Sequence, residues 1–249
     1  MSGAEPTYYV YVITSRNNPI YEEFDKIRRK QMEDLQIPHK FLLNGALPPG
    51  YSLKDDEVYY PEDSVAPWGE TLTLSEAYTP GMFWKFYAEI QRGLPQVDFI
   101  LRLNSSTFVD FQRFEEVALP LLPRKKCFAG NVFDFDVVGG CTPMQQISII
   151  SGTAMIFSRD VLEWFSGVVL DMDDENVKYC IEEEPDDCAI SNILRQLGGY
   201  RFFDLGAFFT HMEAVAEVLN ESTIFYRIKN DDRINTDVLI WQSLLKRLA

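Results

Sequence analysis

The stretch VDFILRL at 97–103 runs directly into NSSTFV at 104–109, and this junction decides the fold. A short run dominated by apolar residues is typical of a buried strand, and the Asn, Ser and Thr residues behind it favour a turn. Comparable strands alternate with helical patterns along the chain, which predicts an α/β fold with a largely parallel sheet. Ligands of such folds bind outside the carboxyl ends of the strands. We therefore expect a site near Asn104–Thr107 and near Thr14–Asn18, which follows the first strand.

The other elements are predicted from apolar periodicity and from turn residues. The predicted strands are 8–14, 40–43, 57–60, 97–103 and 224–229; the predicted helices are 21–35, 72–92 with an interruption at 79–81, 187–197 and 236–248; and 148–165 is read as a strand followed by a helix, behind a turn at Gly139-Gly140. No repeat or Gly/Ser linker divides the chain, so its 249 residues are expected to form one domain.

The composition is that of a globular protein, with 46% hydrophobic and 24% charged residues. No apolar run approaches the roughly 20 residues of a membrane-spanning helix. Residues 1–7 have neither the basic nor the apolar part of a signal peptide. We expect a soluble, cytoplasmic protein.

The charge balance argues against partners that carry phosphate backbones. The formal net charge is −15, and affinity for nucleic acid is built largely from cationic contacts to phosphates. A nucleic acid or an anionic membrane is therefore not an expected partner. Residues 168–190 hold nine acids against one base, Lys178, so much of the charge is concentrated there.

The cysteines and histidines do not predict a metal site. Four cysteines without a CxxC pair and only two histidines, His39 and His211, lack the spacing of a zinc site. Because no secretory signal is present, the four cysteines are expected to be reduced thiols: Cys127, Cys141, Cys180 and Cys188.

Three segments, in order and spacing, carry a family resemblance. They are FILRLNSSTFV at 99–109, SGTAMIFSRD at 151–160 and PDDCAI at 185–190. Together they resemble the inverting GT-A glycosyltransferases of the Fringe and β-1,3-galactosyltransferase family. In that family a strand runs into an Asp-rich turn, a small-residue loop lies where the acceptor meets the sugar, and a Pro-Asp-Asp-Cys segment carries the catalytic base.

The resemblance implies a GT-A-like α/β fold, with a Rossmann-type, mostly parallel central sheet flanked by helices and a smaller mixed sheet. It implies a nucleotide-binding half over about 1–110 and an acceptor-binding half over about 111–249. It also implies transfer of a hexose or pentose from a nucleotide sugar, with UDP as the expected nucleotide, to a hydroxyl of a glycan or glycoprotein. Asp187, the second acid of its segment, would be the base, with Asp186 beside it.

Two departures from the family concern the metal ion. The family's Asp-x-Asp turn holds a divalent cation that bridges the diphosphate, but here the turn is Asn104-Ser105-Ser106, without a carboxylate. Relatives place a metal-binding His near the C-terminus, where this chain has Arg227 and Lys229. Cationic side chains can offset the charge of a leaving group without a metal. We therefore expect a site that needs neither Mn²⁺ nor Mg²⁺.

Each candidate residue has a simpler alternative. Asp186 or Asp187 would serve as a helix N-cap, and crowding with Glu182–Glu184 would raise the pKa of one of these carboxyls. Asn104, Ser105 and Ser106 would bind the nucleotide or form a plain turn. The following list gives the remaining expectations: Arg102 would face the nucleotide; Arg16, Arg227 and Lys229 would face the nucleotide or lie on the surface; Ser151, Gly152 and Thr153 would meet the acceptor and sugar; Trp68, Tyr78 and Trp84 would stack on a sugar or lie in the core; and Asp171–Glu175 would be a solvated loop rather than a Ca²⁺ site.

Two functions follow from these observations. The first is a metal-independent inverting glycosyltransferase without a membrane anchor, of the kind that large DNA viruses or microbes use. The second is a binding module on the same fold that has lost its activity together with its metal ligands, since a fold does not certify activity.

Overall fold

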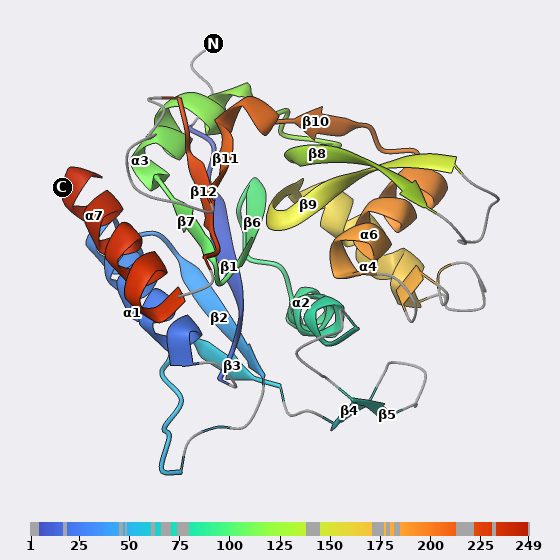
Figure 1. Ribbon diagram of the computed structural model, residues 1–249. Helices are drawn as coiled ribbons and strands as arrows, with labels where there is room; N and C mark the ends of the chain where they lie inside the picture. The colour runs from blue at the N-terminus through green and yellow to red at the C-terminus, as the bar shows by residue number, and fades with distance from the viewer. Residues whose placement is uncertain are drawn as a thin grey trace.

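A seven-stranded sheet forms the centre of the structure, with strand order β10-β8-β9-β6-β1-β2-β3 (Figure 1). The computed structural model describes residues 5–16, 19–44, 47, 49–60, 63–65, 71–73, 80–137, 145–170, 177, 180–181, 185–212, 222–230 and 233–248. The strands of the sheet are β1 Tyr8–Ser15, β2 His39–Asn44, β3 Glu57–Tyr59, β6 Phe99–Asn104, β8 Phe128–Val137, β9 Gln145–Ser158 and β10 Phe202–Asp204.

Most neighbouring strands of this sheet are parallel. β1 is parallel to β2 and to β6, β2 to β3, and β8 to β10, whereas β9 runs antiparallel to β6 and β8. Two smaller sheets accompany it. One has the order β11-β12-β7, and the other pairs β4 with β5. Their strands are β11 Phe209–Met212, β12 Phe225–Ile228, β7 Thr107–Val109, β4 Asp63–Val65 and β5 Thr71–Thr73.

Helices cover both faces of the central sheet. α1 and α7 lie together on one side, and α2, α4 and α6 lie on the other (Figure 1). The α-helices are α1 Pro19–Asp34, α2 Pro80–Arg92, α3 Phe111–Arg113, α4 Arg159–Leu170, α6 Asp186–Asn192 and α7 Val238–Leu248. Short 3₁₀ or π turns are η1 Phe114–Ala118, η2 Leu119–Leu121, η3 Ile193–Leu197, η4 Gly206–Phe208 and η5 Arg233–Asp237. No helix among the described residues is long and apolar enough to cross a membrane.

The strand period of two divides the core between these layers. In β1, Tyr11 and Ile13 belong to the cluster that includes residues of α2, α4 and α6, whereas Val10 and Val12 face the cluster on the opposite side. Residues of β1 are buried on both faces, as expected for a parallel strand between helical layers.

The sequence predictions hold for the central elements but differ from the structure at the start of α2 and in the strands β4, β5, β7, β8, β10 and β11, which were not predicted. The helix predicted over 72–92 begins only at Pro80, because Pro is tolerated in the first turn of a helix and not in its interior. Thr71–Thr73 is instead a strand, paired with Asp63–Val65. The mixed region 148–165 is β9 and α4, but β9 begins at Gln145 and forms a long antiparallel pair with β8, which the sequence analysis did not predict. The predicted turn at Gly139-Gly140 lies outside the described residues.

Candidate active site

The turn behind β6 meets β9 at the carboxyl edge of the sheet. β6 and β9 are antiparallel with Leu103 opposite Ala154, so residues 151–153 continue past the pairing and lie beside the turn. The hydroxyl of Thr107, in β7, donates to the carbonyl oxygen of Thr153 at 2.7 Å. The hydroxyls of Ser151 and Thr153 are also 2.9 Å apart. Two segments predicted separately from the sequence are therefore in contact.

Arg102 connects β6 to the start of α6. Its side chain is fully buried, and its guanidinium donates to a carboxylate oxygen of Asp186 and, at 2.7 Å, to the carbonyl oxygen of Gly152. Burial raises the pKa of the Asp186 carboxyl, and the charge of Arg102 opposes that rise. In this structure Arg102 is thus part of an internal ion pair that fixes α6 against β9.

Asp187 is the more exposed carboxylate of the two. Its Oδ2 accepts a hydrogen bond from the N–H of Gly152 at 2.9 Å, and its Oδ1 accepts one from the N–H of Cys188 at 3.1 Å. The N-cap position of α6 is occupied by Pro185, and no side chain caps this end. The N-cap alternative for Asp186 and Asp187 is therefore wrong: both residues lie in the first turn of the helix, where a negative charge is favoured by the helix dipole.

Gly152 lies where Arg102 and Asp187 approach the backbone. A Cβ atom at this position would be 3.1 Å from Nη1 of Arg102 and 3.2 Å from Oδ2 of Asp187. These distances are tighter than ordinary van der Waals contact, so glycine is the residue that fits without displacing either group. The small-residue loop of the sequence is therefore the surface against which Asp187 is held.

Arg227 faces the same place from β12. β12 pairs with β7 so that Arg227 is opposite Thr107, and its Nη1 donates to the hydroxyl of Thr153 at 3.0 Å. Burial lowers the pKa of the guanidinium, and the charge of Asp187 opposes this. Among the described residues, no carboxylate oxygen lies within 4.0 Å of Arg227. Arg227 is half-buried, whereas Lys229, two residues on, is exposed.

The turn itself is polar and neutral. Ser105 is turned inward, where its hydroxyl donates to the carbonyl oxygen of Ile13 at 3.1 Å. Asn104 has a buried side-chain oxygen without a hydrogen-bond partner, and Ser106 is nearly buried. The carbonyl oxygens of the turn are bonded by Arg28 of α1, a residue that the sequence analysis did not single out.

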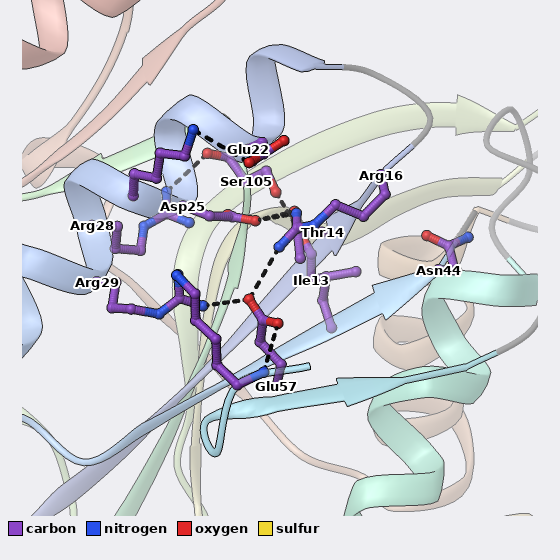
Figure 2. A network of polar contacts seen from close by, with 12 residues as sticks. Ile13, Thr14, Arg16, Glu22, Asp25, Arg28, Arg29, Asn44, Glu57 and Ser105 are labelled. Carbon is purple, nitrogen blue, oxygen red and sulfur yellow. Dashed lines mark hydrogen bonds and ion pairs between the residues drawn. The ribbon is translucent and has the colours of Figure 1, made fainter. Parts of the chain in front are cut away.

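Arg16 belongs to a buried network between the first strand, α1 and β3 (Figure 2). Its side chain is 2% exposed; Nη1 donates to Asp25 at 2.7 Å, and Nη2 lies 3.3 Å from Glu57. Arg29 also donates to Glu57, at 2.6 Å. The guanidinium of Arg16 therefore pairs with carboxylates inside the protein. The predicted contact of Arg16 with a nucleotide remains a prediction, without support from this placement.

Lys85 of α2 is a second polar residue that the sequence analysis missed. Its ammonium group is buried at the carboxyl ends of β1 and β2, where it donates to the carbonyl oxygen of Thr14 at 3.0 Å and to Oδ1 of Asn44 at 2.8 Å. Its charge also acts on Asp186. The signal in the sequence was a lysine within the apolar run that contains Phe83 and Phe86.

The residues at the turn do not suit a divalent cation. Hard cations prefer carboxylate oxygens, but Asn104, Ser105 and Ser106 are neutral and the nearby Asp186 is already paired with Arg102. Within the part of the chain that the structure describes, no group of three His, Cys, Asp or Glu residues could hold a metal ion. Other candidates cannot be placed: Trp68, Tyr78, Asp171–Glu175 and Glu182–Glu184 lie outside the described residues, and only the backbone of Trp84, in α2, is described.

Comparison with known proteins identifies the fold. No family model and no curated protein sequence matches the chain. Among solved structures, it is similar to the galactosyltransferase LgtC in complex with donor and acceptor sugar analogues, at 12% identity and a TM-score of 0.53, with 97% of this chain and 96% of that chain covered.

A glycosyltransferase involved in glycosylation of the major capsid of PBCV-1 is also similar, at 11% identity and a TM-score of 0.50, with 94% of this chain and 98% of that chain covered. The Fringe-type resemblance inferred from the sequence is not confirmed at the level of family. The α/β architecture is confirmed: the chain has the fold of GT-A glycosyltransferases.

Proposed function

We propose that this protein is an inverting glycosyltransferase that moves a sugar from a nucleotide-sugar donor to a hydroxyl group of a glycan or glycoprotein. The observation that carries the proposal is that Asp187 and Arg227 hydrogen-bond to adjacent residues of β9, Gly152 and Thr153, beside the turn 104–106. A partly exposed carboxylate and a guanidinium with no close carboxylate partner among the described residues thus lie at the carboxyl edge of a GT-A sheet. Ligands bind at that edge in open α/β sheets.

The reaction requires a base and a cation, and these residues supply both. In a single displacement the acceptor oxygen forms a bond to the anomeric carbon while the bond from that carbon to the diphosphate oxygen breaks. Asp187 takes the proton of the acceptor hydroxyl, and the electron pair of the broken bond leaves with the nucleoside diphosphate. Arg227 and Lys229 offset the charge that develops on the leaving group. The transition state has oxocarbenium character, as is known for glycoside chemistry.

The two substrates would bind to different halves of the chain. We propose that residues 1–110 form the nucleotide half, with Asn104, Ser105 and Ser106 around the nucleotide, and that residues 111–249 form the acceptor half. The contacts that support this are those of Ser151–Thr153, which lie between the turn and Asp187. An acceptor hydroxyl near Gly152 would be within reach of the base.

Metal independence is part of the proposal. A turn without carboxylates is a poor ligand for Mn²⁺ or Mg²⁺, and the cations of Arg227 and Lys229 provide another source of positive charge. No step of the proposed reaction uses a metal ion.

A non-catalytic binding module is the competing function, and one observation favours it. Both oxygens of Asp187 accept backbone hydrogen bonds, from Gly152 and Cys188, so a structural role would also explain this carboxylate. The negative charge of Asp187 is needed for turnover if the protein is a transferase and is not needed if the protein is a binding module.

The substitution Asp187→Asn separates them. We expect turnover of the reactive UDP-, GDP- or dTDP-sugar to fall by about 10²–10⁴-fold, the range for loss of a general base. The affinity for the nucleoside diphosphate should change little. The matched control is Asp160→Asn, which removes a carboxylate from the first turn of α4, and its turnover should equal that of the wild type. Unchanged turnover in Asp187→Asn, or no turnover by the wild type with any donor, would favour the binding module.

A further inference from the structure

Arg28 of α1 is buried against the inner side of the turn that follows β6 (Figure 2). Its Nη2 donates to the carbonyl oxygens of Ser105 at 2.9 Å and Asn104 at 3.4 Å, and also to that of Thr107. The guanidinium carbon lies 4.9 Å from the ring centroid of Trp241 in α7. Three carbonyl oxygens of one turn therefore point into the protein, at a single buried cation.

The charge of Arg28 is not matched by a close carboxylate. Among the described residues, no carboxylate oxygen lies within 4.0 Å of it, and its Nη1 has no hydrogen-bond partner. Asp25, one turn earlier in α1, acts on Arg28 electrostatically; its Oδ2 accepts from Arg16 and Thr14, each at 2.7 Å, and its Oδ1 is buried without a hydrogen-bond partner. Burial lowers the pKa of Arg28 to about 10, so the guanidinium is charged at neutral pH.

This arrangement changes which ions the turn can bind. Backbone carbonyl oxygens are ligands for a hard cation, but here they are bonded to a guanidinium, and the positive charge repels any cation that approaches the turn. In the low dielectric of the interior the charge is weakly screened, so it acts across the few ångströms of the turn. The same field favours an anion on the outer side.

Ser106, in the same turn, has donor groups that bond no other described residue. Within the described part of the chain, neither the N–H nor the hydroxyl of Ser106 donates a hydrogen bond. Its carbonyl oxygen accepts one from the N–H of Ile228 at 3.3 Å. Across the strand pair, Arg227 stands opposite Thr107 and brings a second cation to this edge. N–H and O–H donors close to positive charge are the groups that bind phosphate oxygens.

We infer that Arg28 makes the turn 104–107 an anion-binding element, which holds a phosphate group of the donor where a metal-dependent relative would hold a cation. Arg28 is a positioning residue: it touches the turn and not the ligand, and it acts through the direction of the carbonyls and through its charge. The inference rests on the proposed function, because it concerns the diphosphate of that donor.

The experiment compares three probes, inorganic pyrophosphate, UDP and uridine, by calorimetry in EDTA. In Arg28→Gln we expect the dissociation constants of pyrophosphate and UDP to rise by about tenfold or more, while that of uridine is unchanged. Arg28→Lys keeps the charge and should stay within about threefold of the wild type for all probes. Arg29→Gln is the matched control, because it removes a buried arginine from the same helix that contacts Asp56 and Glu57 instead of the turn.

The outcomes separate this inference from the proposed function. If folded Arg28→Gln binds pyrophosphate and UDP like the wild type, Arg28 has no such role, while UDP binding still supports the transferase. If both Arg28 variants lose uridine and pyrophosphate equally, the role is only structural and the inference fails. If the wild type binds pyrophosphate through Arg28 but no nucleotide, the turn binds anions and the transferase proposal fails.

A second variant keeps the test decisive if Arg28→Gln does not fold. Asn104→Asp places a negative charge on a partly exposed residue of the turn with little change in side-chain volume. Pyrophosphate affinity in EDTA should fall by about tenfold or more. Unchanged or tighter binding would overturn the inference.

Discussion

At the scale of single residues, the candidate site depends on how closely two side chains approach one backbone position. Gly152 receives Arg102 on its carbonyl oxygen and Asp187 on its N–H. The same two side chains occupy the space that a Cβ would need. The position of the Asp187 carboxylate therefore depends on the lack of a side chain at residue 152.

The substitution Gly152→Ala tests whether this position of the carboxylate matters for activity. The added Cβ would lie 3.2 Å from Oδ2 of Asp187, so the carboxylate must move and its hydrogen bond to the backbone must weaken. We expect turnover to fall by about 10²-fold, the cost of a misplacement of roughly 1 Å. Gly167→Ala in α4 is the control, because nothing lies within 4 Å of its added Cβ, and its activity should not change. Equal activity of the two variants would show that Asp187 is not held for catalysis.

At the scale of elements, the centres of helices and strands could be predicted better than the pairing of one strand with another. The first strand, α1, β2, β6 and α7 follow from apolar periodicity, since each buries one stripe or one run of residues. The alternation of apolar and acidic residues in 132–137 was a usable signal for β8 that was not used. The pairing of β8 with β9 could not be derived, because pairing depends on contacts between segments far apart in the chain.

The candidate site shows the same limit. The sequence and its family resemblance led to Asp187, to 151–153 and to the turn, each as a local motif. That Arg102 would pair with Asp186, and that Arg28 would bond the turn from within, depends on which faces of β6 and α1 point inward. Arg28 does follow Phe24 at helical spacing, which places it on the apolar stripe of α1. A cation on such a stripe indicates that buried hydrogen-bond acceptors lie opposite it in the folded protein.

Cys127 lies directly before β8, and the pH dependence of stability tests whether its thiol is buried. Its side chain is fully buried, and burial raises the pKa of its thiol to about 12. The thiol has a lower pKa, about 8.5, in an unfolded chain. The stability that this shift contributes is therefore fully present below about pH 8.5 and is lost as the pH rises toward about 12, by up to about 1.4 kcal/mol per pH unit.

The variant Cys127→Ala removes this titration. Between pH 9 and 11, urea denaturation should show the free energy of unfolding of the wild type falling more steeply than that of the variant, by up to about 1.4 kcal/mol per pH unit. The comparison cancels the buried tyrosines, which both proteins share. Parallel pH profiles would mean that the thiol is accessible in the folded protein.

At the scale of the whole molecule, an acidic protein holds its cations where an anionic ligand would bind. The net charge of −15 would repel a nucleotide at most of the surface. Yet Arg28 and Arg227, on elements far apart in the sequence, both lie at the carboxyl edge of the sheet, and neither has a carboxylate oxygen within 4.0 Å among the described residues. These positive charges, on a fold shared with glycosyltransferase structures, support the proposal of a donor site that works without a metal ion.

The most direct test of this account is the binding of UDP-, GDP- and dTDP-sugars, measured by thermal shift and calorimetry in EDTA and then with Mn²⁺. We expect one class of nucleotide sugar to bind in EDTA, and at 100 times its dissociation constant to stabilise the fold by about 2.7 kcal/mol. Adding Mn²⁺ should leave the affinity unchanged. Binding that appears only with Mn²⁺ would contradict the metal-free site, and the absence of binding by every donor would contradict the transferase itself.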